Sequence, residues 1–167
     1  MGAAATLRVT LAGQNSHALD LGQDVMSIAA ACALAFGDGV GASQIDRIWS
    51  DERTLAASDT EDLDLNAGNL LDPYGNVVTF AKLKAILVIA DPGNTNTVEV
   101  TKPAANGVPI FLDDEGGIPV RPGGFFAEGA PGAGQVVTAG TGDLITVTNG
   151  GAGTPVTYKV VLLGTSA

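Results

Sequence analysis

The 167-residue chain has little of what catalysis and metal binding need, because it contains one cysteine, Cys32, and one histidine, His17. A single cysteine forms no internal disulfide, and together with a single histidine it builds no zinc site. No nucleophile motif, nucleotide-binding loop or partner base accompanies His17, which lies in a polar segment that predicts an exposed loop. We therefore expect no catalytic residues, no resident metal and no cofactor, and we predict that the protein is not an enzyme.

Basic residues, long apolar runs and aromatic residues are scarce as well. There are 8 Lys and Arg against 18 Asp and Glu, for a net charge of -10, which argues against nucleic acid as a partner because phosphate binding needs clustered basic side chains. The longest uncharged apolar run, Val25–Gly37, is shorter than the roughly 20 residues of a membrane-spanning helix, so no membrane partner is expected. Aromatic residues make up 5%, too few to favour a carbohydrate-binding surface.

What the sequence does contain is 46% hydrophobic residues punctuated by 23 glycines and 8 prolines. This composition is too apolar for disorder, and its short apolar runs between turn residues predict about ten short strands. The expected fold class is all-β, an antiparallel β-sandwich or a jelly-roll-like barrel. Residues 1–24 are expected to form an N-terminal arm or the first strands, and residues 25–167 a single β domain.

Alternating large and small side chains mark the first expected strands. Leu7, Val9 and Leu11 alternate with polar residues, which predicts a half-buried strand. Val25–Phe36 also has larger side chains at every second position, although its alanines are typical of a helix; we favour a strand. Ser43–Leu65 is expected to contain two antiparallel strands joined near residues 57–59.

The clearest strand is expected over Val77–Ala90. The face that contains Leu83, Leu87 and Ile89 is predicted to be core. The other face carries Lys82 and Lys84 between apolar ends, as expected where another sheet or a neighbouring subunit covers a strand over part of its length.

An aromatic pair supplies a second candidate interface. Phe125 and Phe126 are adjacent, so on a strand one enters the core and the other faces outward, where it is a candidate anchor for a partner. The full set of interface candidates is Trp49, Lys82, Lys84, Phe125 and Phe126.

One acidic segment superficially matches a calcium loop. Alternation places Asp62, Asp64 and Asn66 on one face of a strand. An EF-hand is excluded because Ala67 stands where glycine is required and Pro73 where the bidentate glutamate is required. A different cation site and a plain solvated strand face both remain open.

Seven turn and strand segments within Ile45–Gly164 are notable together: Ile48–Ser58, Glu61–Leu65, Tyr74–Ala85, Asn94–Asn96, Val120–Gly124, Thr141–Ile145 and Tyr158–Gly164. Together they resemble a widespread group of small virion proteins of tailed bacteriophages, which are capsid-associated or other structural subunits. These segments are turn and strand motifs rather than catalytic signatures.

The resemblance implies a capsid decoration, or cement, protein on the outer surface of a phage head. Such a subunit is expected to be a homotrimer that binds the major capsid protein and stabilises the joints between capsomers. Two alternatives remain. A tail or head-fibre component would use Met1–Asp24 as an attachment arm, and a secreted carbohydrate-binding module would show a sugar-dependent change in the fluorescence of Trp49.

Overall fold

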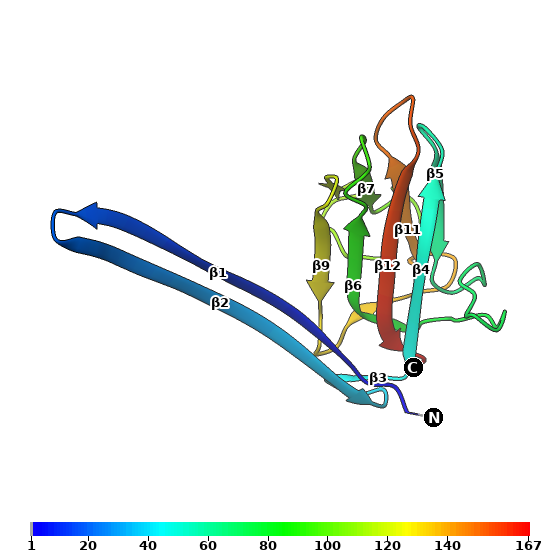
Figure 1. Cartoon of the computed structure of the whole chain (residues 1–167). Coiled ribbons are helices and arrows are strands. Elements are labelled where there is room, and N and C mark those ends of the chain that lie inside the picture. Colours follow the sequence, from blue (N-terminus) through cyan, green and yellow to red (C-terminus); the bar gives the residue numbers. More distant parts are fainter. Residues whose placement is uncertain (1) are drawn as a thin grey trace.

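The computed structural model describes residues 2–167, and every regular element in this part of the chain is a β-strand, twelve in all. The predicted all-β class is therefore confirmed. No helix within the described residues is long and apolar enough to cross a membrane. The strands form two parts: a sandwich-like body and a long hairpin that projects from it (Figure 1).

The body consists of two open sheets packed face to face. One, called here the β6 sheet, contains β4 (Arg47–Leu55), β12 (Val156–Thr165), β6 (Lys82–Ala90), β9 (Phe125–Gly129) and β10 (Gln135–Val136). The other, the β11 sheet, contains β5 (Thr60–Asp64), β11 (Leu144–Asn149), β7 (Val98–Thr101) and β8 (Gly117–Val120). All pairs within these two sheets are antiparallel, and neither sheet closes on itself, so the sandwich is present rather than the barrel.

The core lies between the two sheets and is built by alternation along their strands. Ile86 and Val88 of β6 and Leu162 of β12 point inward and are fully buried. Val100, Ile145 and Val147 meet them from the β11 sheet. Burying one such side chain contributes about 1.5–3 kcal/mol relative to leaving it in water. Apolar residues at every second position of the strands therefore hold the two sheets together without a disulfide.

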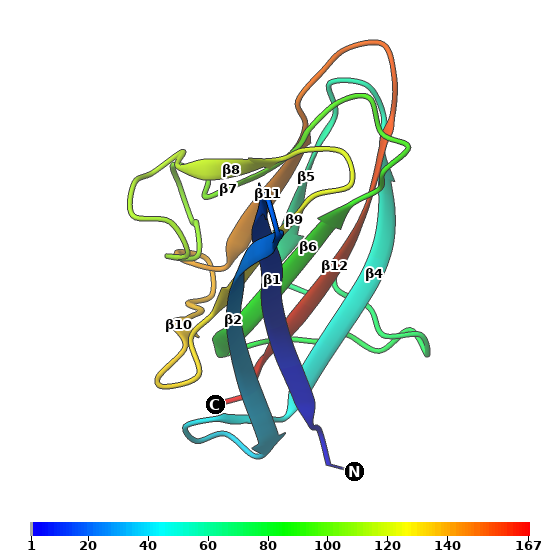
Figure 2. The same cartoon turned by 60° about the vertical axis from the view of Figure 1, so that its left-hand side comes forward.

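The projecting hairpin, called here the hairpin arm, consists of β1 (Ala5–Leu19) and β2 (Gly22–Asp38). Its antiparallel register runs without interruption from Ala5 opposite Phe36 to Leu19 opposite Gly22. The short strand β3 (Gln44–Ile45) pairs in parallel with the base of β2. Figures 1 and 2 show that the arm crosses in front of the β6 sheet at its base and then leaves the body.

The arm is longer than the sequence suggested. The predicted strand at Val25–Phe36 is present, but it pairs with β1 and not with any strand of the body. Residues 1–24 were expected to form an arm or the first strands; the projecting hairpin contains β1 from this range and continues through β2 to Asp38. The two strands form a ladder with each other because a short turn at Asp20 and Leu21 joins them.

The two strands expected within Ser43–Leu65 are present, but they do not form a hairpin. β4 pairs with β12 in the β6 sheet, and β5 pairs with β11 in the β11 sheet. The turn between them crosses from one sheet to the other, because Leu55 and Leu63 both have to reach the core between the sheets.

The strand expected over Val77–Ala90 is shorter than predicted, and most of its predicted core face points outward. β6 begins at Lys82; Leu83 is buried in the core as predicted, but Ala85, Leu87 and Ile89 face away from the core. A bulge between Leu163 and Gly164 of the neighbouring strand shifts the local register. Periodicity could not decide the orientation, because both faces of this strand are apolar and the outward one is partly covered by the arm.

Candidate interaction surface

The hairpin arm has one apolar face. Directly paired residues of an antiparallel ladder share a face, so Leu7 lies beside Leu34, and Val9 beside Cys32. Further along, the same face continues with Leu11, Ile28 and Met26. These residues, Leu7, Val9, Leu11, Met26, Ile28, Cys32 and Leu34, are called here the apolar arm face. The opposite face carries small and polar side chains such as Thr6, Arg8, Thr10, Ala31, Ala33 and Ala35.

This face is buried at the base of the arm and exposed from its middle to its tip. Phe36, at the base, is 3% exposed, and Leu34 is partly buried. Ile28 is 50% exposed and Leu11 61% exposed. One continuous apolar surface is therefore covered by the body at one end and open to solvent at the other.

The base of the arm packs against the side of the β6 sheet that faces away from the core, called here the outer face. Phe36, Leu7 and Leu34 form a second hydrophobic cluster with Ala85 and Leu163 of this face. Leu34 sits over Gly129 of β9, where a Cβ atom would displace Cδ1 of Leu34 from its present position. The bare backbone of Gly129 thus gives the leucine side chain room close to the sheet.

The outer face is largely apolar in successive rows across four strands. The register aligns Ile48, Leu163, Ala85 and Gly129 in one row, and Ser50, Val161, Leu87 and Ala127 in the next. A third row contains Glu52, Lys159, Ile89 and Phe125. The arm of the same chain covers much of the first row, whereas Ile48, Ile89 and Phe125 remain exposed.

Two cavities lie between the arm and the outer face where the arm departs from the sheet. One of about 190 Å³ lies between Leu7 and the residues Ile48 and Val161. The other, of about 310 Å³, lies between Val9 and the residues Leu87 and Phe125. Their walls are mainly apolar side chains. The gap between the arm and the sheet therefore widens away from the base and is lined by apolar groups.

Physical chemistry makes this arm a candidate site for association. A lone two-stranded hairpin is marginally stable in water, and a third strand or a cover for its apolar face is needed for independent stability. Long unpaired strand edges are also ready to pair with another chain. Beyond its base the arm has neither a cover nor an edge partner among the described residues. It therefore offers an exposed apolar face and unpaired strand edges to which another chain could bind.

The two phenylalanines lie as alternation predicted. Phe126 points inward and stacks on Phe111, with 5.7 Å between ring centroids. Phe125 points outward, is 59% exposed and borders the larger cavity beside Val9. Phe125 thus belongs to the outer face, and Phe126 to the core.

The other three interface candidates do not lie on an open surface. Trp49 is 2% exposed, and its Nε1 donates a hydrogen bond of 3.0 Å to the carbonyl oxygen of Leu71. Lys84 is buried, and its ammonium group donates to the carbonyl oxygen of Gly132. Burial, followed by the charge of Lys82, lowers the pKa of Lys84. Lys82 is half-buried.

These positions correct the sequence interpretation of Trp49 and Lys84. Trp49 alternates inward with Leu55 along β4, so its ring packs in the core and offers no stacking surface to a sugar. Lys84 was expected on a partly covered strand face, but it is enclosed by the segment around Gly132. Neither residue is available to a partner.

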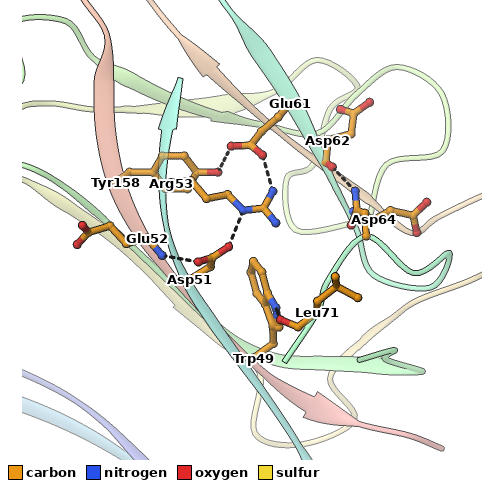
Figure 3. A network of polar contacts seen from close by, with 10 residues as sticks. Trp49, Asp51, Glu52, Arg53, Glu61, Asp62, Asp64, Leu71 and Tyr158 are labelled. Carbon is orange, nitrogen blue, oxygen red and sulfur yellow. Dashed lines mark hydrogen bonds and ion pairs between the residues drawn. The ribbon is translucent and has the colours of Figure 1, made fainter. Parts of the chain in front are cut away.

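A polar network closes the edge where β4 and β5 meet (Figure 3). Tyr158 is fully buried and donates a 2.8 Å hydrogen bond to Oε1 of Glu61, while Arg53 donates to the other carboxylate oxygen. Arg53 also donates to Asp51 over 3.0 Å and lies 5.2 Å from the ring centroid of Trp49. Because Arg53 and Tyr158 belong to one sheet and Glu61 to the other, the network joins the two sheets.

The surroundings of this network shift two pKa values. Burial, together with the hydrogen bond to Glu61, raises the pKa of Tyr158, which stays protonated as the donor. Burial acts to lower the pKa of Arg53, but its hydrogen bonds with Glu61 and Asp51 outweigh this and raise it. Both groups are held in one protonation state, as suits a structural tie.

The acidic strand face does not converge into a metal site. Asp62 accepts a 2.6 Å hydrogen bond from the hydroxyl of Thr146. Asp64 caps the following turn by accepting from the backbone N–H groups of Asn66 and Ala67. Within residues 2–167, no group of three or more His, Cys, Asp or Glu side chains is placed to hold a metal ion.

His17 lies near the tip of the arm, in a strand rather than in the loop that we expected. It is exposed and sits opposite Asp24 in the hairpin register. Cys32 is an exposed free thiol on the apolar arm face. Neither residue is near the polar network of the body.

The apolar arm face was not recognised from the sequence, although a signal for it was present. The alternating series Leu7–Leu11 and Val25–Phe36 flank the short polar turn at Asp20, as in a long hairpin. Comparison of the chain with protein-family models, curated proteins and solved structures finds no match. The interpretation of the arm therefore depends on its own geometry.

Proposed function

We propose that this protein is a structural subunit of a tailed-bacteriophage virion, a capsid decoration protein that binds the outer surface of the head. The observation that carries the proposal is the hairpin arm, whose apolar face is buried at the base and exposed beyond it. An arm of this kind is suited to assembly, because it places apolar surface outside the body where a partner can cover it. The resemblance of segments within Ile45–Gly164 to phage virion proteins supports the same role.

In this function the protein binds the major capsid protein and other copies of itself, with a homotrimer as the expected form. It stabilises the shell by burying apolar area across the joints between capsomers, at about 25 cal/mol per Å² before the costs of binding. The apolar core and the tie between Arg53, Glu61 and Tyr158 give the body a rigid shape. A rigid body is what a repeated lattice contact requires.

A tail or head-fibre component is the second candidate, and the projecting arm supports it as well. That hypothesis expects Met1–Asp24 to be an attachment arm, and β1 lies within this range, in a hairpin that projects from the body. The carbohydrate-binding alternative loses its expected probe, because Trp49 is buried.

The deciding experiment incubates the purified protein with phage heads stripped of surface proteins and, separately, with isolated tails. Binding to heads, seen by cosedimentation and located by electron microscopy, together with a higher temperature of DNA release, is the expected result. Binding to tails alone would favour the second candidate. Failure to bind either particle would contradict both.

A further inference from the structure

The apolar arm face and the outer face of the β6 sheet are both apolar, and they contact each other only at the base of the arm. In the single chain the rest of each surface stays exposed to solvent. From this we infer that the arm of one copy docks on the exposed part of the outer face of a second copy. The inference deepens the proposed function and rests on it, because it identifies the subunit's own copy as the partner of the arm. The exposed part of the outer face consists of Ile48, Ile89 and Phe125, with Leu87 half-buried beside them.

The first argument is continuity with a contact that the structure already contains. The base of the arm packs its apolar face against the outer face, with Leu34 seated over Gly129. The uncovered surfaces are extensions of these same two surfaces, one toward the arm tip and one across the sheet. A second copy therefore offers the arm the kind of surface to which its base is already fitted.

The second argument is reach. Because the base of the arm lies on its own sheet, the free part of β1 runs from Leu11 to Leu19 and spans about 30 Å at about 3.3 Å per residue. A body of the size formed by residues 39–167 has a radius of gyration of about 14 Å, or a diameter of about 36 Å. The free part of the arm is thus long enough to cross most of a neighbouring body.

The arm does not fold back over its own sheet. Its ladder is continuous from Ala5–Phe36 to Leu19–Gly22, with no bulge or break at which the ribbon could bend sharply. The wedge-shaped cavity beside Val9 and Phe125 shows that the two surfaces already diverge there. The exposed part of the outer face is therefore left for another molecule.

The third argument is charge, because a chain with a net charge of -10 repels its own copies. The two surfaces largely avoid this repulsion. From Leu7 to Met26 the apolar arm face carries no charge, and Asp24, which follows Met26 on the same face, lies opposite His17 near the tip. The charges in the rows of the outer face, Glu52 and Lys159, form an ion pair of 3.4 Å. Two copies can therefore meet here without bringing like charges together.

The test uses one variant on each surface and a matched control. Leu11→Asp places a charge on the apolar arm face, Phe125→Asp places one on the outer face, and Ala12→Asp places one on the opposite face of the arm, one residue from Leu11. All three positions are exposed, and circular dichroism checks that each variant is folded. Light scattering gives the mass in solution at micromolar concentration.

We expect the wild type and Ala12→Asp to be oligomeric, and Leu11→Asp and Phe125→Asp to be monomeric when each is alone. A mixture of the last two should recover dimers, because the intact arm of the Phe125→Asp copy can dock on the intact outer face of the Leu11→Asp copy. A monomeric wild type, equal loss in Ala12→Asp, or a mixture that stays monomeric would each overturn the inference.

The outcome is distinguishable from that of the proposed function. A monomer that binds phage heads would overturn arm exchange and leave the decoration role standing. An oligomeric protein whose Leu11→Asp and Phe125→Asp variants form dimers when mixed, but which binds neither heads nor tails, would support arm exchange and contradict the proposed function.

Discussion

The hairpin arm and the sandwich body follow the same sequence pattern with opposite results. In both regions apolar residues recur at every second position of paired strands. In the body the second sheet covers these residues, so Leu162 is completely buried; in the arm nothing covers Leu11, which is 61% exposed. The difference teaches that period-2 patterning determines which side chains share a face, whereas the surrounding layers determine whether that face is core or contact surface.

The comparison also separates folding from assembly. The body contains the main buried cluster and the polar tie between sheets, and the base of the arm adds a second buried cluster, so these side chains account for most of the free energy of unfolding. Beyond its base, the arm contributes apolar area that is buried only when a partner covers it. Substitutions in the two regions should therefore affect different measurements.

The largest effect is expected from Leu162→Ala in the core. Removing a fully buried leucine side chain loses its transfer free energy and leaves a cavity, for a cost of about 2–5 kcal/mol. Urea denaturation followed by circular dichroism measures it. A loss below about 1 kcal/mol would mean that the region between the sheets is loosely packed and would weaken the contrast between body and arm.

A smaller effect is expected from Glu61→Ala in the polar network. The substitution leaves the buried hydroxyl of Tyr158 without its acceptor and removes one partner of Arg53, for a cost of about 1–3 kcal/mol. The matched control is Glu52→Ala, whose ion pair with Lys159 is exposed and worth about 0–1 kcal/mol. Equal effects in the two variants would contradict the role of Glu61 in joining the sheets.

Much of the fold could be predicted from the sequence because strand formation is a local property. The alternation in Val25–Phe36 correctly indicated a strand over the competing helix, and alternation correctly separated Phe125 from Phe126. Pairing is not local. The partner of Val25–Phe36 and the sheet to which β5 belongs depend on contacts between distant segments, which periodicity does not specify.

The candidate site was harder to predict for the same reason. Trp49 and Lys84 looked like surface candidates, but their burial is decided by Leu71 and Gly132, which lie far along the chain. The apolar arm face was visible as two separate strands, but it becomes one surface only through the register that places Leu7 beside Leu34. Knowledge of the turn at Asp20 would have linked the two strands.

A pH-dependent effect is expected from Glu128→Gln. Glu128 lies in the inward row of β9, and its Oε2 is buried without a hydrogen-bond partner in the described part of the chain. Burial raises the pKa of Glu128 above its ordinary value of 4.5, against a smaller opposing hydrogen bond with Gln135. The folded state therefore holds the proton more tightly than the unfolded state.

Below the unfolded pKa the carboxyl is protonated in both states, so its burial as a charged group costs no stability. As pH rises from the unfolded pKa through the folded pKa, the free energy of unfolding of the wild type decreases. Glu128→Gln, which stays neutral, should be more stable than the wild type at pH 7, and the difference should shrink as pH falls toward 4.5. Urea denaturation across this pH range measures it. A gain of the same size at every pH would contradict burial of the charge as its cause.

The smallest effect on folding is expected from Leu11→Ala in the arm, the same chemical change as Leu162→Ala in the core. Because Leu11 is exposed in the single chain, its truncation should alter the free energy of unfolding by less than about 0.5 kcal/mol. The measurement is urea denaturation at the lowest workable protein concentration, repeated at higher concentrations. The difference from the wild type should increase with concentration, because association buries Leu11 and links folding to binding. A loss as large as that of Leu162→Ala at every concentration would mean that the arm is part of the core, and the distinction between the two regions would fail.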